Sequence, residues 1–174
     1  RKLVLNDGAP LFDGVGIARS KTTFHRAAQP ENWEQAPGVL RELKGQDFPA
    51  LSDTDWEELS RIQWQDRNGA PVPSIDKSLF DDFSSVDFEG EQEDLWPEWA
   101  ILAKRPVLLV RGEHSAMVTQ PISEQMAAAH SGRRIKIASG QGHVPLLHVG
   151  DLVPVIANFL SDGSAGAHSD RTDS

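Results

Sequence analysis

The chain has 174 residues, of which 39% are hydrophobic and 25% charged, a composition typical of one globular domain rather than of a disordered or fibrous chain. Its formal net charge of −9 argues against binding nucleic acid or an anionic membrane through a basic face. The sequence has no cysteine, which excludes disulfides, a thiol nucleophile and Cys-ligated zinc but leaves the cellular compartment open. No apolar run approaches the ~20 residues that span a bilayer. We expect a soluble, cytoplasmic protein.

Three short apolar runs, residues 2–6, 107–110 and 135–138, predict strands that are buried on both faces of a parallel sheet. Helical spacing of apolar residues follows the second and third runs, over residues 121–130 and 151–160. The order is therefore β–α–β–α, which predicts an α/β fold with a parallel sheet and helices packed on its faces.

Residues 11–103 separate the first two strands, and we expect them to form an acidic, mostly helical cap over the sheet, because a structureless loop of that length is improbable. Within this insertion, Ser52 precedes acidic residues in the pattern of a helix start. Trp56, Leu59 and Ile62, and with them Trp64, would share the apolar face of that helix. Residues 79–80 predict the beginning of another short helix.

The boundaries that follow are 1–10 and 104–160 for the α/β core, 11–103 for the cap and 161–174 for a disordered tail. Three strands are few for such a sheet, and the first would leave an apolar edge unpaired. We therefore expect further strands upstream of this chain; a small three-stranded domain is the less favoured alternative.

Residues whose side chains could take part in catalysis follow the strands, at the sheet edge where ligands bind in open α/β folds. They are Asp7 after the first strand, the loop with Glu113 and Ala116 after the second, and His143 after the third. Glycines on both sides of Gln141 allow a sharp turn that would bring the His143 imidazole over the sheet edge. Imidazole suits general-base chemistry near neutral pH, although a surface histidine is the commoner outcome for a single residue.

Three segments in this order resemble the α/β-hydrolase fold family. LVLNDGAP (residues 3–10) resembles the strand after the family's nucleophile helix, PVLLVRGEHS (106–115) its acid-bearing strand and loop, and GQGHVPL (140–146) its catalytic-histidine loop. The insertion lies where the family places its cap. The resemblance implies that His143 is the catalytic histidine.

The family carries its nucleophile on a G-x-S-x-G elbow upstream of the first of these strands, together with the oxyanion hole. This sequence contains neither G-x-S-x-G nor G-x-D-x-G. It therefore resembles the carboxyl-terminal portion of such an enzyme. We expect the chain alone to be inactive and to have the N-terminal segment of the same enzyme as a partner.

The acid of the triad is open to three interpretations. In the family an aspartate commonly follows the serine of the acid loop, whereas Ala116 follows Ser115 here. We rank first a replacement of that aspartate at Ala116, engineered to silence the enzyme, second an acid supplied by Asp7, and third an acid supplied by Glu113. Asp7 could equally be a turn residue that bonds its own backbone, and Glu113 a solvated loop charge.

The resemblance implies cleavage of a small ester or related bond, with an upstream nucleophile and with His143 as base and then acid. An aspartate nucleophile would instead make the protein an epoxide hydrolase or haloalkane dehalogenase. A non-catalytic binding protein on this fold is the alternative from another class, and would explain Ala116 as decay of the triad. We expect a small-molecule substrate, no cofactor, no metal, and no nucleic-acid or membrane partner.

An apolar acyl pocket could be lined by Trp33, Trp56, Trp96 and Val144. Tryptophans of this kind are more often part of a hydrophobic core than of a ligand site.

Overall fold

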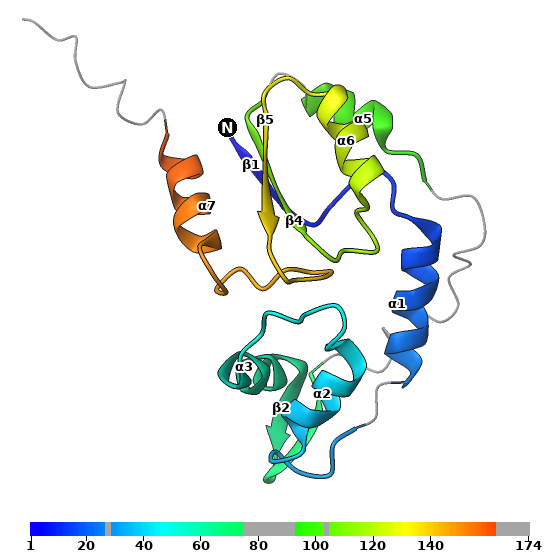
Figure 1. The fold of residues 1–174 in the computed structure, drawn as a ribbon, viewed down its shortest axis with the longest axis vertical. Helices are drawn as coiled ribbons and strands as arrows, with labels where there is room; N and C mark the ends of the chain where they lie inside the picture. Colours follow the sequence, from blue (N-terminus) through cyan, green and yellow to red (C-terminus); the bar gives the residue numbers. More distant parts are fainter. Residues whose placement is uncertain (27–28, 75–92, 103–104, 163–174) are drawn as a thin grey trace, which may run out of the picture.

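The computed structural model describes residues 1–26, 29–74, 93–102 and 105–162. Its main sheet contains β1 (Leu3–Asn6), β4 (Val107–Gly112) and β5 (Arg133–Ala138), in the spatial order β1-β4-β5. Both pairings are parallel, with Leu3 beside Val107 and Val107 beside Arg133. The predicted parallel sheet and the three strands are confirmed, and the class is α/β (Figure 1). The expectation of two buried faces is wrong for β5, an edge strand in the described sheet on which Ile135 and Ile137 are exposed.

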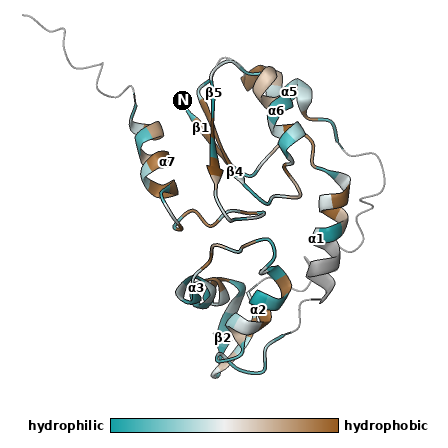
Figure 2. Cartoon of the chain, viewed as in Figure 1, coloured by the Kyte–Doolittle hydropathy of each residue, from teal (hydrophilic) through white to brown (hydrophobic). Residues whose placement is uncertain are grey.

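Strand β4 is buried along its whole length, because helices cover both faces of the sheet. Val107 and Leu109 pack in a cluster with residues of α5 (Trp96–Ile101) and α6 (Gln120–Ala128). The alternate residues of β4 pack with α7 (Leu152–Ser161) on the other face. Figure 2 shows hydrophobic residues along β4 and in α7. The continuous apolar run in the sequence therefore reflects a strand with two buried faces.

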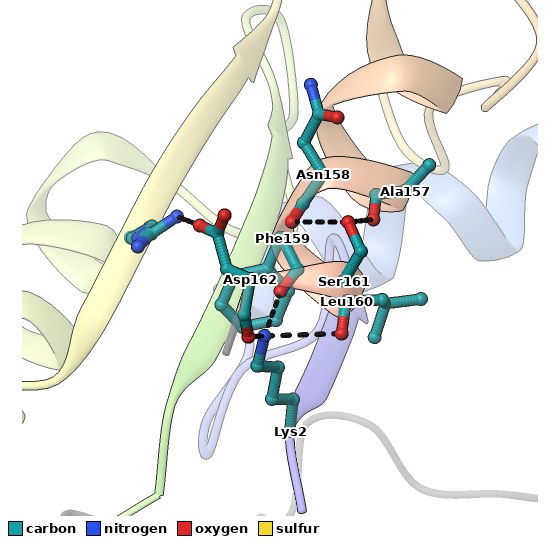
Figure 3. A network of polar contacts seen from close by, with 8 residues as sticks. Lys2, Ala157, Asn158, Phe159, Leu160, Ser161 and Asp162 are labelled. Atoms are coloured by element: carbon teal, nitrogen blue, oxygen red, sulfur yellow. Dashed lines mark hydrogen bonds and ion pairs between the residues drawn. The ribbon is translucent and has the colours of Figure 1, made fainter. Parts of the chain in front are cut away.

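The start of β1 is tied to the end of α7 by Lys2 (Figure 3). Its ammonium donates to the carbonyl oxygens of Phe159 at 2.5 Å and Leu160 at 3.2 Å, and also to that of Asp162. The carboxylate of Asp162 in turn pairs with Arg134 of β5 at 2.8 Å. These contacts satisfy carbonyls that have no partner within the helix, and they place positive charge where the helix dipole favours it.

Up to residue 74, the insertion contains three helices and a β-hairpin: α1 (Gly14–Arg26), α2 (Ala36–Lys44), α3 (Asp53–Gln63), β2 (Trp64–Arg67) and β3 (Ala70–Pro73). Residues of α2, α3 and β2 contribute to a second apolar cluster that includes Leu40, Trp56 and Trp64, and Leu146 and Val149 of the loop after β5 pack against it. The arrowhead of β5 points toward this part of the molecule in Figure 1. The insertion therefore lies at the carboxyl ends of the parallel strands, where a cap would contact a site.

The helix start predicted at Ser52 is confirmed. The Ser52 hydroxyl accepts a hydrogen bond from the backbone N–H of Asp55 at 3.3 Å, and the Asp55 carboxylate accepts one from the backbone N–H of Ser52 at 2.8 Å. This reciprocal pair is a capping box, which satisfies two backbone donors at the beginning of α3. Hydrogen bonds from Ser52 also hold the pKa of Asp55 below its usual value.

Two expectations for the insertion are wrong. Trp64 is not on the face of α3 but is the first residue of β2, which pairs antiparallel with β3. Trp96 and Trp99 lie in α5 and pack with the sheet, so the last part of the expected cap belongs to the α/β core.

The helix expected at residues 79–80 and the tail from 163 onward lie outside the described residues. In the described part of the chain, no helix combines the length and the apolar character needed to cross a membrane.

Candidate active site

Asp7 and His143 meet at the carboxyl edge of the sheet. Asp7 follows β1 and His143 lies in the loop after β5, so the two residues come from the strands on either side of β4. The imidazole Nδ1 lies 2.8 Å from the carboxylate Oδ2 of Asp7. Asp7 is fully buried, whereas the His143 side chain is 26% exposed. The arrangement holds the carboxylate in the protein and leaves part of the imidazole accessible.

Backbone contacts with β4 fix the carboxylate of Asp7. Its backbone N–H donates to the carbonyl of Val110 at 2.7 Å, and its Oδ1 accepts a hydrogen bond from the N–H of Gly112 at 3.0 Å. Asp7 has a φ of 53°, in the left-handed region that aspartate tolerates better than most residues. One carboxylate oxygen is therefore anchored to the sheet and the other faces His143.

The loop that carries His143 is held by two residues that the sequence analysis did not identify. Asn6, at the end of β1, donates from Nδ2 to the carbonyl of Pro145 at 3.0 Å. Gln141 is buried, and its Oε1 accepts a hydrogen bond from the N–H of Leu146 at 2.7 Å. Each has a position that could have indicated this role, because Asn6 precedes the candidate acid and Gln141 lies between two glycines.

The contact with Asp7 determines which nitrogen of His143 is free to react. An ionised carboxylate only accepts hydrogen bonds, so Nδ1 of a neutral imidazole must carry the proton. The lone pair is then on Nε2, where a general base needs it. The ring also makes an edge contact with Phe12, at a centroid distance of 6.2 Å and an interplanar angle of 71°. This neighbour restricts the ring, although it was not among the predicted site residues.

A cavity lies beside His143, between the sheet edge and the insertion. Its lining includes Ala116 and Met117 from the loop after β4, and Phe48 from the turn after α2. Charged side chains also reach it from the insertion: Arg19, Lys44 and Asp47. Ser20 is the residue with a side-chain hydroxyl in this lining. The cavity gives a ligand access to the candidate general base.

The first-ranked interpretation of the acid is revised. Asp7 lies against Nδ1 of His143, so the imidazole has a carboxylate partner although position 116 is alanine. Ala116 lines the cavity and its carbonyl approaches α1 so closely that a Cβ on Gly16 would lie 2.0 Å from it. The sequence pattern could not choose between Asp7 and position 116, because both follow strands that end at the same sheet edge.

Glu113, the third-ranked acid, is bonded elsewhere. Its Oε2 accepts a hydrogen bond from the backbone N–H of Gly140 at 2.7 Å. That bond, with a second from Ser139, holds the pKa of the Glu113 carboxyl below its usual value. Gly140 has a φ of +65°, and a Cβ there would lie 2.3 Å from that of Ala50. Glu113 therefore stabilises the turn before His143, and its carboxylate bonds Gly140 instead of the imidazole.

The residues expected to bind substrate lie apart from this cavity. Trp56 is buried in the apolar cluster of the insertion and Trp96 packs against the cluster on the sheet. Trp33 packs beside Trp56's cluster and donates from Nε1 to Asp66 at 2.7 Å. No tryptophan is among the described residues that line the cavity. Val144 follows His143 and is 42% exposed.

Among the residues that the structure describes, one group of potential metal ligands occurs where α3 faces the histidine loop. Asp55, Glu58 and His148 each offer an atom, and these atoms lie within 4.8 Å of one another. His148 lies 3.2 Å from Glu58, and the Asp55 carboxylate already accepts hydrogen bonds from Ser52. Ion pairing and helix capping therefore account for the group.

Comparisons with known proteins identify the fold. The sequence matches no protein-family model and none of the curated proteins. The structure, however, resembles an α/β hydrolase from Novosphingobium aromaticivorans, with 27% sequence identity, a TM-score of 0.78, and coverage of 91% of this chain and 55% of that one. It resembles E-2-(acetamidomethylene)succinate hydrolase at 17% identity and a TM-score of 0.67, over 92% of this chain and 57% of that one. It also resembles an esterase from Exiguobacterium antarcticum at 14% identity and a TM-score of 0.51, over 92% of this chain and 56% of that one.

A parallel sheet covered on both faces and these structural matches together define the class: the chain has the α/β-hydrolase fold. It spans between 55% and 57% of the length of the three solved proteins. The resemblance that the three sequence segments predicted is confirmed at this level.

Proposed function

We propose that the chain supplies the histidine and acid of a hydrolase that cleaves a small ester or related bond. The observation that carries the proposal is the contact between the buried Asp7 carboxylate and Nδ1 of His143, at the edge of a cavity. Three of the similar solved proteins are an α/β hydrolase, a second hydrolase and an esterase, which agrees with this reaction class.

In the proposed reaction, Nε2 of His143 removes the proton from a nucleophile as the nucleophile attacks the ester carbonyl. Asp7 keeps the imidazole in the required tautomer and stabilises the imidazolium that forms. His143 then gives its proton to the departing alcohol oxygen. Water, activated in the same way, releases the acid product and returns the nucleophile to its initial state. One water is consumed and one C–O bond is broken.

The nucleophile is proposed to come from outside these 174 residues, because the sequence has no G-x-S-x-G or G-x-D-x-G elbow. The chain alone is then inactive. A serine nucleophile fits an esterase, and an aspartate nucleophile would direct the same His143–Asp7 pair to an epoxide or a haloalkane. The complete pair argues against the alternative of a non-catalytic binding protein, since decay at position 116 is no longer needed to explain the site.

The test is hydrolysis of p-nitrophenyl acetate by the protein that carries this sequence together with its nucleophile. We expect His143→Asn to lower kcat by about 10³-fold or more, because the general base is lost. The matched control is Ser20→Ala, which removes the hydroxyl in the cavity lining. We expect that variant to retain activity. Full activity of His143→Asn would overturn the role of the histidine, whereas loss of activity in Ser20→Ala would place the nucleophile within this chain.

A further inference from the structure

The cavity beside His143 contains positive charge that the proposed reaction does not use. Arg19 of α1 and Lys44 of α2 both line it, and so does Asp47 from the turn after α2. Arg19 pairs with Asp47 at 2.7 Å between Nη2 and Oδ1. These two charges compensate each other, and Lys44 therefore supplies one additional positive charge to the lining.

Lys44 is held in an environment that penalises its charge. Burial lowers the pKa of its ammonium, and the charge of Asp47 offsets that effect only in part. Within the described residues, the ion pairs closer than 4 Å do not include Lys44, and Asp47 directs an oxygen to Arg19 instead. A partly desolvated ammonium without a paired carboxylate costs free energy, which an anionic ligand would offset.

The position of Lys44 in the last turn of α2 does not explain this burial. A cation there interacts favourably with the helix dipole, but it can do so from solvent. Arg41, in the same turn, is 52% exposed and pairs with Asp53. The helix terminus already has an exposed cation in Arg41, so the turn of Lys44 toward the cavity requires another reason.

We propose that the substrate carries a carboxylate, that Lys44 binds this group in the cavity, and that the bond to be hydrolysed lies beside His143. The proposal deepens the proposed function and rests on it. The single uncompensated cation matches the single charge of a carboxylate better than the charge of a phosphate monoester, which is about −1.5 to −2 near pH 7. The apolar parts of Phe48 and Met117 line the same cavity and would contact the carbon chain of the substrate.

The proposal predicts discrimination between a charged and an uncharged ester of the same size class. Monomethyl succinate carries one carboxylate at neutral pH, whereas dimethyl succinate carries none. Hydrolysis adds water to either ester and releases methanol, so the chemical step is the same. We expect kcat/KM to be about tenfold or more higher for monomethyl succinate, because a charge-assisted hydrogen bond forms only with that ester.

The variant Lys44→Met keeps most of the side-chain length and removes the charge. We expect it to abolish the preference for monomethyl succinate, because kcat/KM should fall much more for that ester than for dimethyl succinate. The control is Lys136→Met, which removes a lysine on β5 that pairs with Asp151 and does not line the cavity. This control should keep the preference. An unchanged preference in Lys44→Met, or no preference in the unmodified protein, would overturn the proposal.

A binding measurement separates failure of this proposal from failure of the proposed function. Monomethyl succinate is titrated into the 174-residue chain, and amide shifts of Phe48, Ala116 and His143 are followed by NMR. Shifts that disappear in Lys44→Met and persist in Lys136→Met would support the carboxylate site even if neither ester is hydrolysed. Equal binding by the two variants would refute the site, whatever the hydrolysis assay gives.

Discussion

The two sides of the cavity are built from different kinds of interaction. On the sheet side, Asp7 is fully buried and is bonded to the N–H of Gly112 and to His143. On the side of the insertion, the Arg19–Asp47 pair has side chains that are 49% and 31% exposed. The sheet side is therefore positioned by the backbone, and the other side by long side chains that water can reach.

This difference separates the proposed chemistry from the proposed recognition. Proton transfer requires geometry within a few tenths of an ångström, which a strand end with a buried carboxylate provides. Charge recognition tolerates more freedom, because the attraction between charges falls off slowly with distance. Substitutions in the two regions should therefore have different consequences, which the following experiments test.

The largest expected effect is that of Asp7→Asn on catalysis. An amide at this position no longer holds His143 in the required tautomer or stabilises the imidazolium, so we expect kcat to fall by about 10⁴-fold. Steady-state kinetics on p-nitrophenyl acetate measures the loss. The ¹⁵N chemical shifts of the imidazole should also show that the Nδ1–H tautomer is no longer the only one populated.

Glu113→Gln is the control for that substitution, since Glu113 bonds Gly140 and not His143, and it should retain activity. If kcat falls less than about tenfold in Asp7→Asn and rises in Ala116→Asp, position 116 would be assigned as the position of the acid instead. This outcome would also remove the contrast between a chemical side fixed by backbone bonds and a recognition side formed by long side chains.

Trp56→Ala tests whether the insertion has its own core. The side chain is buried beside Leu40 and Trp64, so its removal should lower the free energy of unfolding by about 3–5 kcal/mol. Urea denaturation measures the change, and Trp33→Ala, at a partly buried position, should cost less. If the Asp7–His143 contact survives by NMR in Trp56→Ala, the two regions are separable. Its loss would show that they depend on one another.

Ser52→Ala should have a smaller effect, confined to the beginning of α3. It removes the acceptor for the N–H of Asp55 and one donor to the Asp55 carboxylate. We expect a loss of about 1 kcal/mol in the free energy of unfolding. Ser52→Asp retains an acceptor at this position and should recover part of that stability despite the nearby negative charge. An unchanged urea midpoint in Ser52→Ala would mean that the capping box adds nothing to the insertion.

The smallest expected effect concerns acid stability at Glu113. Its pKa is lowered in the folded protein by the hydrogen bonds from Gly140 and Ser139. The folded state therefore binds fewer protons than the unfolded state, and the stabilisation is present above the usual pKa of 4.5 and lost as the pH falls through the lower folded value. In Glu113→Gln we expect a lower Tm at neutral pH and a flatter dependence of Tm on pH in acid. Parallel curves would contradict this account.

The sheet and His143 could be predicted from the sequence because their signals are local. The apolar residues of β4 are consecutive, and a strand with two buried faces has that pattern. The contact of Asp7 with the imidazole could not be predicted, because it depends on which strand end lies beside His143. The structure supplies that information through the 2.8 Å contact.

The hairpin of the insertion could have been recognised from its turn. Residues 67–71 predict a turn, and Asn68 and Gly69 both have positive φ values, 56° and 85°. Asparagine followed by glycine is the strongest short signal for a two-residue hairpin connection. The start of the hairpin at Trp64 is harder to predict, because Trp56 and Trp64 are at helical spacing. An aromatic residue that would continue a helical face can also begin a strand. The charged lining of the cavity had no such local signal, because Arg19 and Lys44 are distant in sequence from His143.

Asp7 and His143 are 136 positions apart in the sequence. Their contact can form only when β1 and the loop after β5 have both joined β4, so it is expected late in folding. The entropy of closing the intervening loop grows only with the logarithm of its length, and a doubling costs about 0.6 kcal/mol. Evolution could therefore lengthen, shorten or replace much of the insertion with little effect on the pair, and so change the ligand while keeping the proposed reactive pair.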